Sequence, residues 1–250
     1  MSMVSPRRVH VLTGVRAVLF DFDGTLVCQS IDFPRMRADV LDLAARFGVH
    51  ADDLAGLPAL EIVGAVAQRL EAADGGQVAA YRREAEQAIE AVEMAAVSVA
   101  RLHAGVPAAL ENLAERGYAI GIVTRNCRRA VGEFLTRYPL VHHVLVTRDD
   151  VAHVKPDPRH LHDAARRLSI PIRCCLMCGD HPMDVAAGRA AGAYTAAVVY
   201  EGAVIGREAF VEPYAPDLVI DSVPELVAHM PDSAPDCVKA SKEGGIPRDA

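Results

Sequence analysis

The sequence contains no long hydrophobic run and no strongly basic segment. No window of about eighteen uninterrupted apolar residues occurs, so we expect no membrane-spanning helix. The formal net charge is −7, and without a large basic block we expect no nucleic-acid partner. The first residues do not form the apolar core of a secretory signal, because His10, Thr13, Gly14 and Arg16 interrupt them. We therefore expect a cytoplasmic protein.

Lysine is scarce, and the cysteines show no sign of a disulfide framework. Only three of the 26 basic residues are lysines, and Lys155 is the only one among the first 238 positions. Without a secretory signal, the six cysteines are not expected to pair. Cys175 and Cys178 have the spacing of half a zinc site, but they lie in an apolar run and no second such pair occurs. Buried thiols in a strand explain them better.

The apolar pattern predicts a parallel α/β core. Short apolar runs typical of buried strands occur at 15–20, 118–123, 144–146, 173–178, 195–199 and 218–220. Helical patterns lie between them at 108–116, 127–138, 158–168 and 182–191. Strands that alternate with helices of about ten residues imply right-handed crossovers and a parallel sheet covered on both faces.

A different pattern separates the first strand from the rest. Between about 33 and 102, three long helical patterns occur without a strand pattern. We therefore predict a Rossmann-like core of residues 14–28 and 104–230, with an inserted all-helical domain at 29–103. Residues 1–13 are predicted to be an N-terminal tail. Residues 231–250 are rich in proline and glycine and are predicted to be a disordered tail.

Polar groups follow four of the predicted strands. The segment from Asp21 to Leu26 (DFDGTL) follows the first strand, and Thr124-Arg125-Asn126 follows the second. Lys155-Pro156-Asp157-Pro158 comes shortly after the third strand, and Gly179-Asp180, with Asp184 four residues on, follows the fourth. Ligands of such sheets bind beyond the carboxyl ends of the strands. We expect all four groups to meet at one edge.

The four groups and their order resemble the motifs of the haloacid dehalogenase (HAD) superfamily of hydrolases. The resemblance covers about 15–28 and 104–230. Thr25-Leu26 and the helical insert resemble the subgroup that carries a helical cap between its first two motifs, which includes phosphoglycolate-phosphatase-like enzymes. The resemblance implies a phosphatase that uses Mg²⁺ and hydrolyses a small phosphorylated metabolite through an aspartyl phosphate.

The resemblance also implies a role for each acidic residue of the motifs. Asp21 would attack phosphorus, and Asp23 would act as general acid and then as general base. Asp21, Asp180 and the carbonyl oxygen of Asp23 would bind Mg²⁺, which prefers oxygen ligands. Asp184 would contact the metal through water or support its ligands.

The remaining motif residues would bind the phosphoryl group. Lys155 would supply positive charge among the carboxylates. Thr124 would offer its hydroxyl and its backbone N–H to the phosphoryl oxygens, and Arg125 and Asn126 would be further contacts. Arg35 or Arg37, at the start of the cap, could hold a second anionic group of the substrate.

Several alternatives stay open at this point. A sugar-phosphate mutase would share Asp21 and Asp23, and a non-catalytic metal-binding or regulatory module would share the fold. Asp23 argues against a dehalogenase, and a cap without lysine argues against phosphonate cleavage. His181 is expected to be passive, and His142, His143, His153, His160 and His162 match no zinc pattern. The specific substrate and the oligomeric state are left open.

Overall fold

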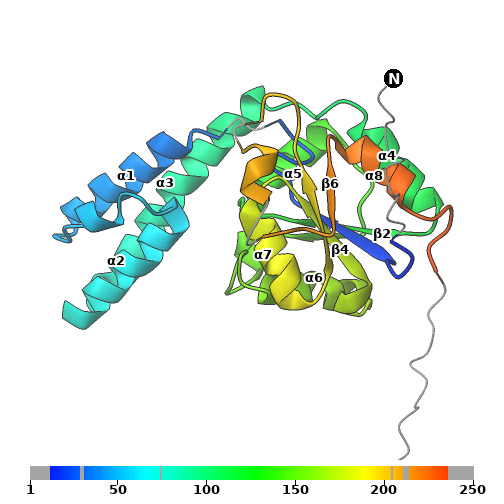
Figure 1. Ribbon diagram of the computed structural model, residues 1–250. Coiled ribbons are helices and arrows are strands. Elements are labelled where there is room, and N and C mark those ends of the chain that lie inside the picture. Colours follow the sequence, from blue (N-terminus) through cyan, green and yellow to red (C-terminus); the bar gives the residue numbers. More distant parts are fainter. Residues whose placement is uncertain (1–11, 29–30, 74, 204, 211–213, 236–250) are drawn as a thin grey trace, which may run out of the picture.

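The computed structural model describes residues 12–28, 31–73, 75–203, 205–210 and 214–235 of the 250-residue chain (Figure 1). Within this part, six strands form one sheet in the order β3-β2-β1-β4-β5-β6, and every pair is parallel. The strands are β1 (Ala17–Phe20), β2 (Ala119–Val123), β3 (Val144–Val146), β4 (Cys175–Gly179), β5 (Tyr194–Val198) and β6 (Leu218–Ile220). The predicted α/β class and the parallel sheet are confirmed.

β1 lies at the centre of the sheet. All four of its residues are buried, as expected of a strand whose two faces are both covered. Ala17 pairs with Ala119 of β2 on one side and with Cys175 of β4 on the other. The carboxyl ends of these three strands therefore lie next to one another.

Helices cover both faces of the sheet (Figure 1). α4 (Val106–Glu115), α5 (Arg128–Arg137) and α8 (Val223–His229) pack on one face, where Phe20, Ile122 and Cys178 point. α6 (Arg159–Leu168) and α7 (Pro182–Ala191) pack on the other. The sequence pattern did not predict α8, because seven residues with two prolines nearby are too few to show helical periodicity.

A helical insert stands beside the sheet (Figure 1). It consists of α1 (Phe33–Arg46), α2 (Ala59–Ala73) and α3 (Val78–Val99), as the three helical patterns predicted. It has a hydrophobic core separate from that of the sheet, in which Val40, Ile62, Val66, Tyr81 and Ile89 are buried. α3 also packs against α5 of the sheet domain.

The chain leaves and re-enters the sheet domain at one place. Val27 forms an isolated antiparallel bridge with Leu102, and the Cys28 N–H donates to the Arg101 carbonyl oxygen over 2.8 Å. The two ends of the insert thus lie side by side, although the whole insert separates them in sequence.

The described residues at both ends of the chain contact the core. The Leu12 N–H donates to the carbonyl oxygen of His229, and the Tyr118 hydroxyl donates to that of Pro231. The Ala234 N–H donates to the Arg116 carbonyl oxygen over 2.7 Å. Residues 231–235 are therefore bonded to the core; the remainder of the predicted tails, 1–11 and 236–250, lies outside the described residues. None of the helices that the structure describes is both long and apolar enough to cross a membrane.

Candidate active site

Asp21 stands directly after the central strand. Its N–H donates to the Cys178 carbonyl oxygen over 2.9 Å, which continues the β1–β4 pairing by one residue. Its Oδ1 accepts a hydrogen bond from the Phe22 N–H at 2.7 Å. Phe22 is buried and packs edge-on against Phe134 of α5, with the ring centroids 5.3 Å apart. Asp21 is thus fixed at the rim while its neighbour anchors the turn in the core.

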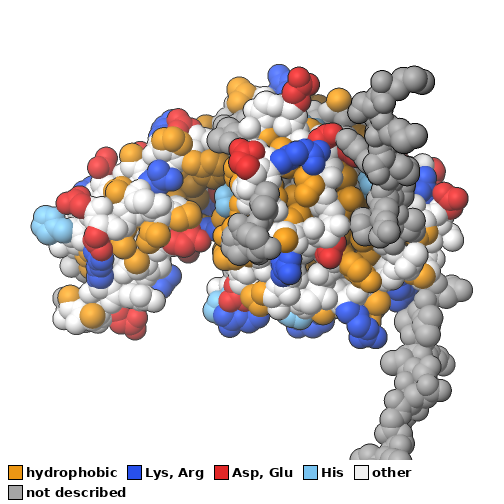
Figure 2. All heavy atoms as spheres, viewed as in Figure 1, with side chains coloured by type: hydrophobic (Ala, Val, Ile, Leu, Met, Phe, Trp, Pro, Cys, Tyr) orange, Lys and Arg blue, Asp and Glu red, His pale blue; other side chains and the backbone are white. Residues whose placement is uncertain are grey.

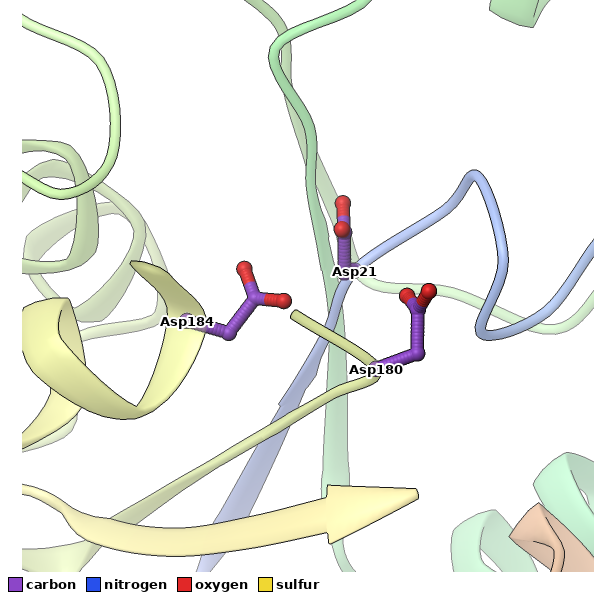
Figure 3. Close-up of side chains that lie close together, drawn as sticks. All are labelled: Asp21, Asp180 and Asp184. Atoms are coloured by element: carbon purple, nitrogen blue, oxygen red, sulfur yellow. The ribbon is translucent and has the colours of Figure 1, made fainter. Parts of the chain in front are cut away.

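Three carboxyl groups gather at this rim around one ammonium group. Asp21 follows β1, Asp180 follows β4 and Asp184 lies in the first turn of α7 (Figure 3). Their oxygens lie within 4.8 Å of one another. The Lys155 Nζ is 2.8 Å from Oδ1 of Asp21 and 2.7 Å from Oδ1 of Asp184, and the lysine is buried. The only lysine in the body of the chain therefore lies among the acidic residues, as predicted.

The backbone makes room for these carboxylates at two glycines. Gly24 has a φ of +86°, and a Cβ atom there would lie 2.1 Å from Oδ2 of Asp180. A Cβ atom on Gly179 would lie 2.2 Å from Oδ2 of Asp184. The Thr25 hydroxyl donates to Oδ1 of Asp180 over 2.7 Å and holds that side chain. Thr25 was expected only as part of a motif, and the structure adds this contact.

The carboxyl groups of Asp21, Asp23 and Asp180 have raised pKa values. Burial is the main cause, and the negative charge of Asp21 adds to it for Asp23 and Asp180. The pKa of Asp21 rises to about 6 although Lys155 lowers it, that of Asp23 to about 7 and that of Asp180 to about 8. Burial alone would lower the pKa of Lys155, but Asp184 and Asp21 raise it overall, so this side chain is charged.

The acidic group fits a divalent cation. It offers only carboxylate oxygens, the ligands that Mg²⁺ prefers, and they come from three different elements that converge on one space (Figure 3). One ammonium group does not balance the negative charges of three carboxylates, and this adds to the effect of burial on the pKa values of Asp21 and Asp180. A bound cation would supply the missing positive charge.

Asn126 and Thr124 complete the site from the end of β2. The Asn126 Nδ2 donates to Oδ2 of Asp23 over 3.0 Å, so this carboxyl group is oriented by a side chain from the loop after β2. The Thr124 hydroxyl accepts from the Asn126 N–H at 3.0 Å. The expectation that the Thr124 backbone N–H contacts the phosphoryl group is wrong in this structure, because that N–H donates to the Val146 carbonyl oxygen and extends the β2–β3 pairing.

Arg125 connects the site to the helical insert. One of its terminal nitrogens lies 2.8 Å from each carboxylate oxygen of Glu61 of α2, an ion pair between the sheet domain and the insert. Its other terminal nitrogen donates to the Lys155 carbonyl oxygen over 3.1 Å. Arg125 therefore lies at the site, as predicted, with its guanidinium group already bonded on two sides.

A buried ion pair that sequence reasoning missed supports the same loop. Glu93 of α3 pairs with Arg148, and both side chains are almost fully buried. Glu93 also accepts from the Cys127 N–H, and Arg148 donates to the Arg125 carbonyl oxygen over 3.2 Å. The available signal was the position of Glu93 on the apolar face of its helix, one residue after Val92.

Arg35 is not part of this arrangement. Its side chain is 64% exposed and pairs with Asp39, one helical turn away. Arg37 instead lines the cavity described below, and its Nε donates to the Leu57 carbonyl oxygen over 3.0 Å. The geometry therefore favours Arg37 over Arg35 as a residue near the substrate.

The histidines have structural contacts. The His181 Nδ1 accepts from the Met183 N–H over 3.1 Å and so caps α7, and the residue also lines the cavity described below, so its passive role stays a prediction. The Nδ1 atoms of His143 and His160 accept from the backbone N–H groups of Ile120 and Lys155. Among the described residues, the acidic trio is the one cluster with the makings of a metal site.

A cavity of about 650 Å³ opens above the acidic residues. Its floor is formed by the ends of β1, β2 and β4, and its opposite wall by α1, α2 and α3. Figure 2 shows an indentation between the insert and the sheet domain, with hydrophobic side chains where the two meet. Asp21, Asp23, Thr124, Asn126 and Asp180 all line this cavity, so the predicted residues converge on one accessible space.

Known proteins share part of this sequence and the fold. The chain is 38% identical over 125 residues to the pyrophosphatase PpaX of Bacillus thuringiensis (strain Al Hakam), which is 49% of this chain and 56% of that protein. The chain thus spans little more than half the length of this relative. Its fold is similar to that of a hydrolase from Pseudomonas syringae, with a TM-score of 0.62, 23% identity and coverage of 86% of this chain and 97% of the other.

A second structure has the same architecture. The crystal structure of a predicted phosphoglycolate phosphatase from Haemophilus somnus 129pt superposes with a TM-score of 0.58 at 18% identity, covering 86% of this chain and 98% of the other. The sequence model of the haloacid dehalogenase-like hydrolases matches residues 15–192, which contain all four motifs. The chain therefore belongs to the haloacid dehalogenase-like hydrolase family.

Proposed function

We propose that the protein is a Mg²⁺-dependent phosphatase that hydrolyses a small phosphorylated metabolite. The observation that carries the proposal is the convergence of Asp21, Asp23 and Asp180 on one cavity, with the buried Lys155 in contact with Asp21. Asp21, Asp180 and Asp184, with the Asp23 carbonyl oxygen, would hold Mg²⁺. The cation would offset the repulsion between a phosphate dianion and the attacking carboxylate.

In the first step, an oxygen of the Asp21 carboxylate attacks phosphorus and the bond from phosphorus to the ester oxygen breaks. The protonated Asp23 gives its proton to the departing alkoxide, so an alcohol leaves and an aspartyl phosphate remains. The raised pKa of Asp23, about 7, supports this role because a fraction of the group is protonated near neutral pH. Asn126 holds the carboxyl group in place.

In the second step, water attacks the phosphorus of the aspartyl phosphate. Asp23, now a carboxylate, takes a proton from the water, and the bond from phosphorus to Asp21 breaks. Inorganic phosphate leaves and both aspartates return to their first state. Lys155, bonded to Asp21 and Asp184, would hold the nucleophile in position and share the negative charge of the phosphoryl oxygens.

Hydrolysis of 4-nitrophenyl phosphate with Mg²⁺ tests the proposal. We expect turnover by the native chain and a loss of at least about a thousandfold in Asp21→Asn, which keeps the shape of the side chain but removes the nucleophilic oxygen. Equal rates for the two proteins would contradict the proposal and favour a non-catalytic module. Conversion of a sugar phosphate to an isomer without free phosphate would instead indicate a mutase.

A further inference from the structure

The cavity above the acidic rim has two chemically different ends. The sheet end carries the acidic residues and Thr124, whereas the end formed by the insert is lined mainly by apolar side chains, with Arg37 and Glu93 among them. These apolar residues are Ile31, Phe33, Met36, Ala59, Leu60 and Ile89. A phosphoryl group bound at Asp21 would therefore direct the rest of its molecule toward a hydrophobic wall.

The aromatic residues on the sheet side add to this wall. His103 and Tyr200 both line the cavity and stack with ring centroids 3.6 Å apart and an interplanar angle of 2°. The Tyr200 hydroxyl donates to the Thr25 carbonyl oxygen over 2.8 Å. Because this hydroxyl is already bonded inside the protein, the residue presents mainly its ring to the cavity.

The cations near the cavity are largely occupied by protein groups. Lys155 contacts two aspartates, and Arg125 contacts both oxygens of Glu61. Arg125 and Arg37 line the cavity, and the Nε of Arg37 is bonded to a backbone carbonyl oxygen. Glu201 and Glu93, the latter paired with Arg148, also line the cavity. Except beside Arg37, a second anionic group on the substrate would meet apolar and acidic neighbours, which is unfavourable.

The size of the cavity agrees with a leaving group of several carbon atoms. About 650 Å³ lies within the range of pockets that bury most of a drug-sized ligand. A two-carbon acid or a second phosphate would fill little of it. Phe33, the first residue of α1, is a large aromatic residue that is 46% exposed. A ligand that covers its ring would gain binding free energy by removing this apolar surface from water.

We propose that the substrate is a phosphate monoester of an uncharged, apolar alcohol, whose hydrocarbon part packs between α1, α2 and the His103–Tyr200 pair. This inference rests on the proposed phosphatase function and names its substrate class. It separates the chain from enzymes that act on inorganic pyrophosphate or on phosphoglycolate, whose leaving groups are anionic.

Matched esters of primary alcohols test the inference, with Mg²⁺ present and phosphate release as the readout. We expect kcat/KM for hexyl phosphate to exceed that for methyl phosphate by at least about 30-fold, since each buried methylene is worth up to about fourfold. We expect hexyl phosphate to exceed the ester of 6-hydroxyhexanoate, which differs by one terminal carboxylate, by at least about tenfold. A preference for the carboxylate ester, for phosphoglycolate or for pyrophosphate would overturn the inference.

Two variants test whether the preference for hexyl over methyl phosphate arises in this cavity. Phe33→Ser is expected to lower the ratio of kcat/KM for hexyl over methyl phosphate about fivefold. Val99→Ser removes a side chain that is 63% exposed and does not line the cavity, so the ratio should not change. If the native chain prefers an anionic ester and Arg37→Gln abolishes that preference, Arg37 binds a second anion and the inference is wrong.

A binding measurement separates this inference from the proposed function. Calorimetry on the Asp21→Asn variant would compare hexylphosphonate with 6-phosphonohexanoate, neither of which can be hydrolysed as an ester. Tighter binding of hexylphosphonate, by about tenfold, would support the apolar site even if no ester were turned over and the phosphatase proposal failed. Equal or weaker binding would refute the apolar site whatever the enzyme's activity.

Discussion

The pair between Glu93 and Arg148 offers a sharp test of how the insert is held on the sheet domain. The side chains of Arg148 and Glu93 are 10% and 4% exposed. Replacing one partner of such a buried pair leaves an uncompensated charge, which typically costs about 3–5 kcal/mol of unfolding free energy. In Arg148→Met we expect a loss of this size. For a chain of 250 residues, it corresponds to a fall in Tm of roughly 6–20 °C.

Arg129→Met is the matched control. Arg129 of α5 pairs with Glu90 over 2.7 Å, so this pair also ties α3 to the sheet domain, but these side chains are 70% and 35% exposed. Solvent screens such a pair, and its loss should cost less than about 1 kcal/mol. Urea denaturation at neutral pH would measure both variants.

The double variant Glu93→Leu/Arg148→Met removes both charges from the interior. It should recover most of the lost stability, because apolar side chains of similar size can replace a buried pair at little cost. If Arg148→Met cost no more than Arg129→Met, the pair would be effectively hydrated and this reasoning would be refuted.

Two further predictions concern residues around the site. Burial lowers the pKa of His160 from 6.5 to about 3, so the free energy of unfolding falls as the pH drops below about 6.5, by about 2 kcal/mol at pH 5. His160→Asn keeps an acceptor for the Lys155 N–H and should lose less stability between pH 7 and pH 5. An equal loss in the variant would show that His160 is not the group responsible. Gly179→Ala should displace the Asp184 carboxylate and lower kcat about a hundredfold or more. In the control Gly132→Ala, the new Cβ meets nothing within 4 Å and kcat should be unchanged. Similar kcat values for the two variants in a phosphate-release assay would show that the site tolerates the displaced carboxylate.

The residues at the strand ends could be predicted because their positions follow from the topology of a parallel sheet. A parallel sheet brings the ends of neighbouring strands together, so Asp21, Thr124 and Asp180 could be placed at one rim from the order of the apolar runs. The burial of Lys155 between Asp21 and Asp184 agrees with the expectation that these carboxylates need a positive neighbour.

Contacts between the insert and the sheet domain could not be predicted in this way. Glu61 and Glu93 reach their arginine partners only when the insert is docked, and no periodicity in the sequence specifies that docking. The Thr124 N–H was misassigned for a related reason, because the edge pairing of β2 with β3 runs one residue further than the apolar run. Tyr200 follows β5, a strand end that carried no charged motif to draw attention to it.

The narrow connection between the insert and the sheet domain bears on how the chain folds. β1 pairs with β2 only after the whole insert has been synthesised, and bringing such distant segments together costs chain entropy. An insert that collapses around Val40 and Ile62, with its ends bridged at Val27 and Leu102, acts as a short tether between the two strands. The chain can therefore assemble its central strands as though they were near neighbours in sequence.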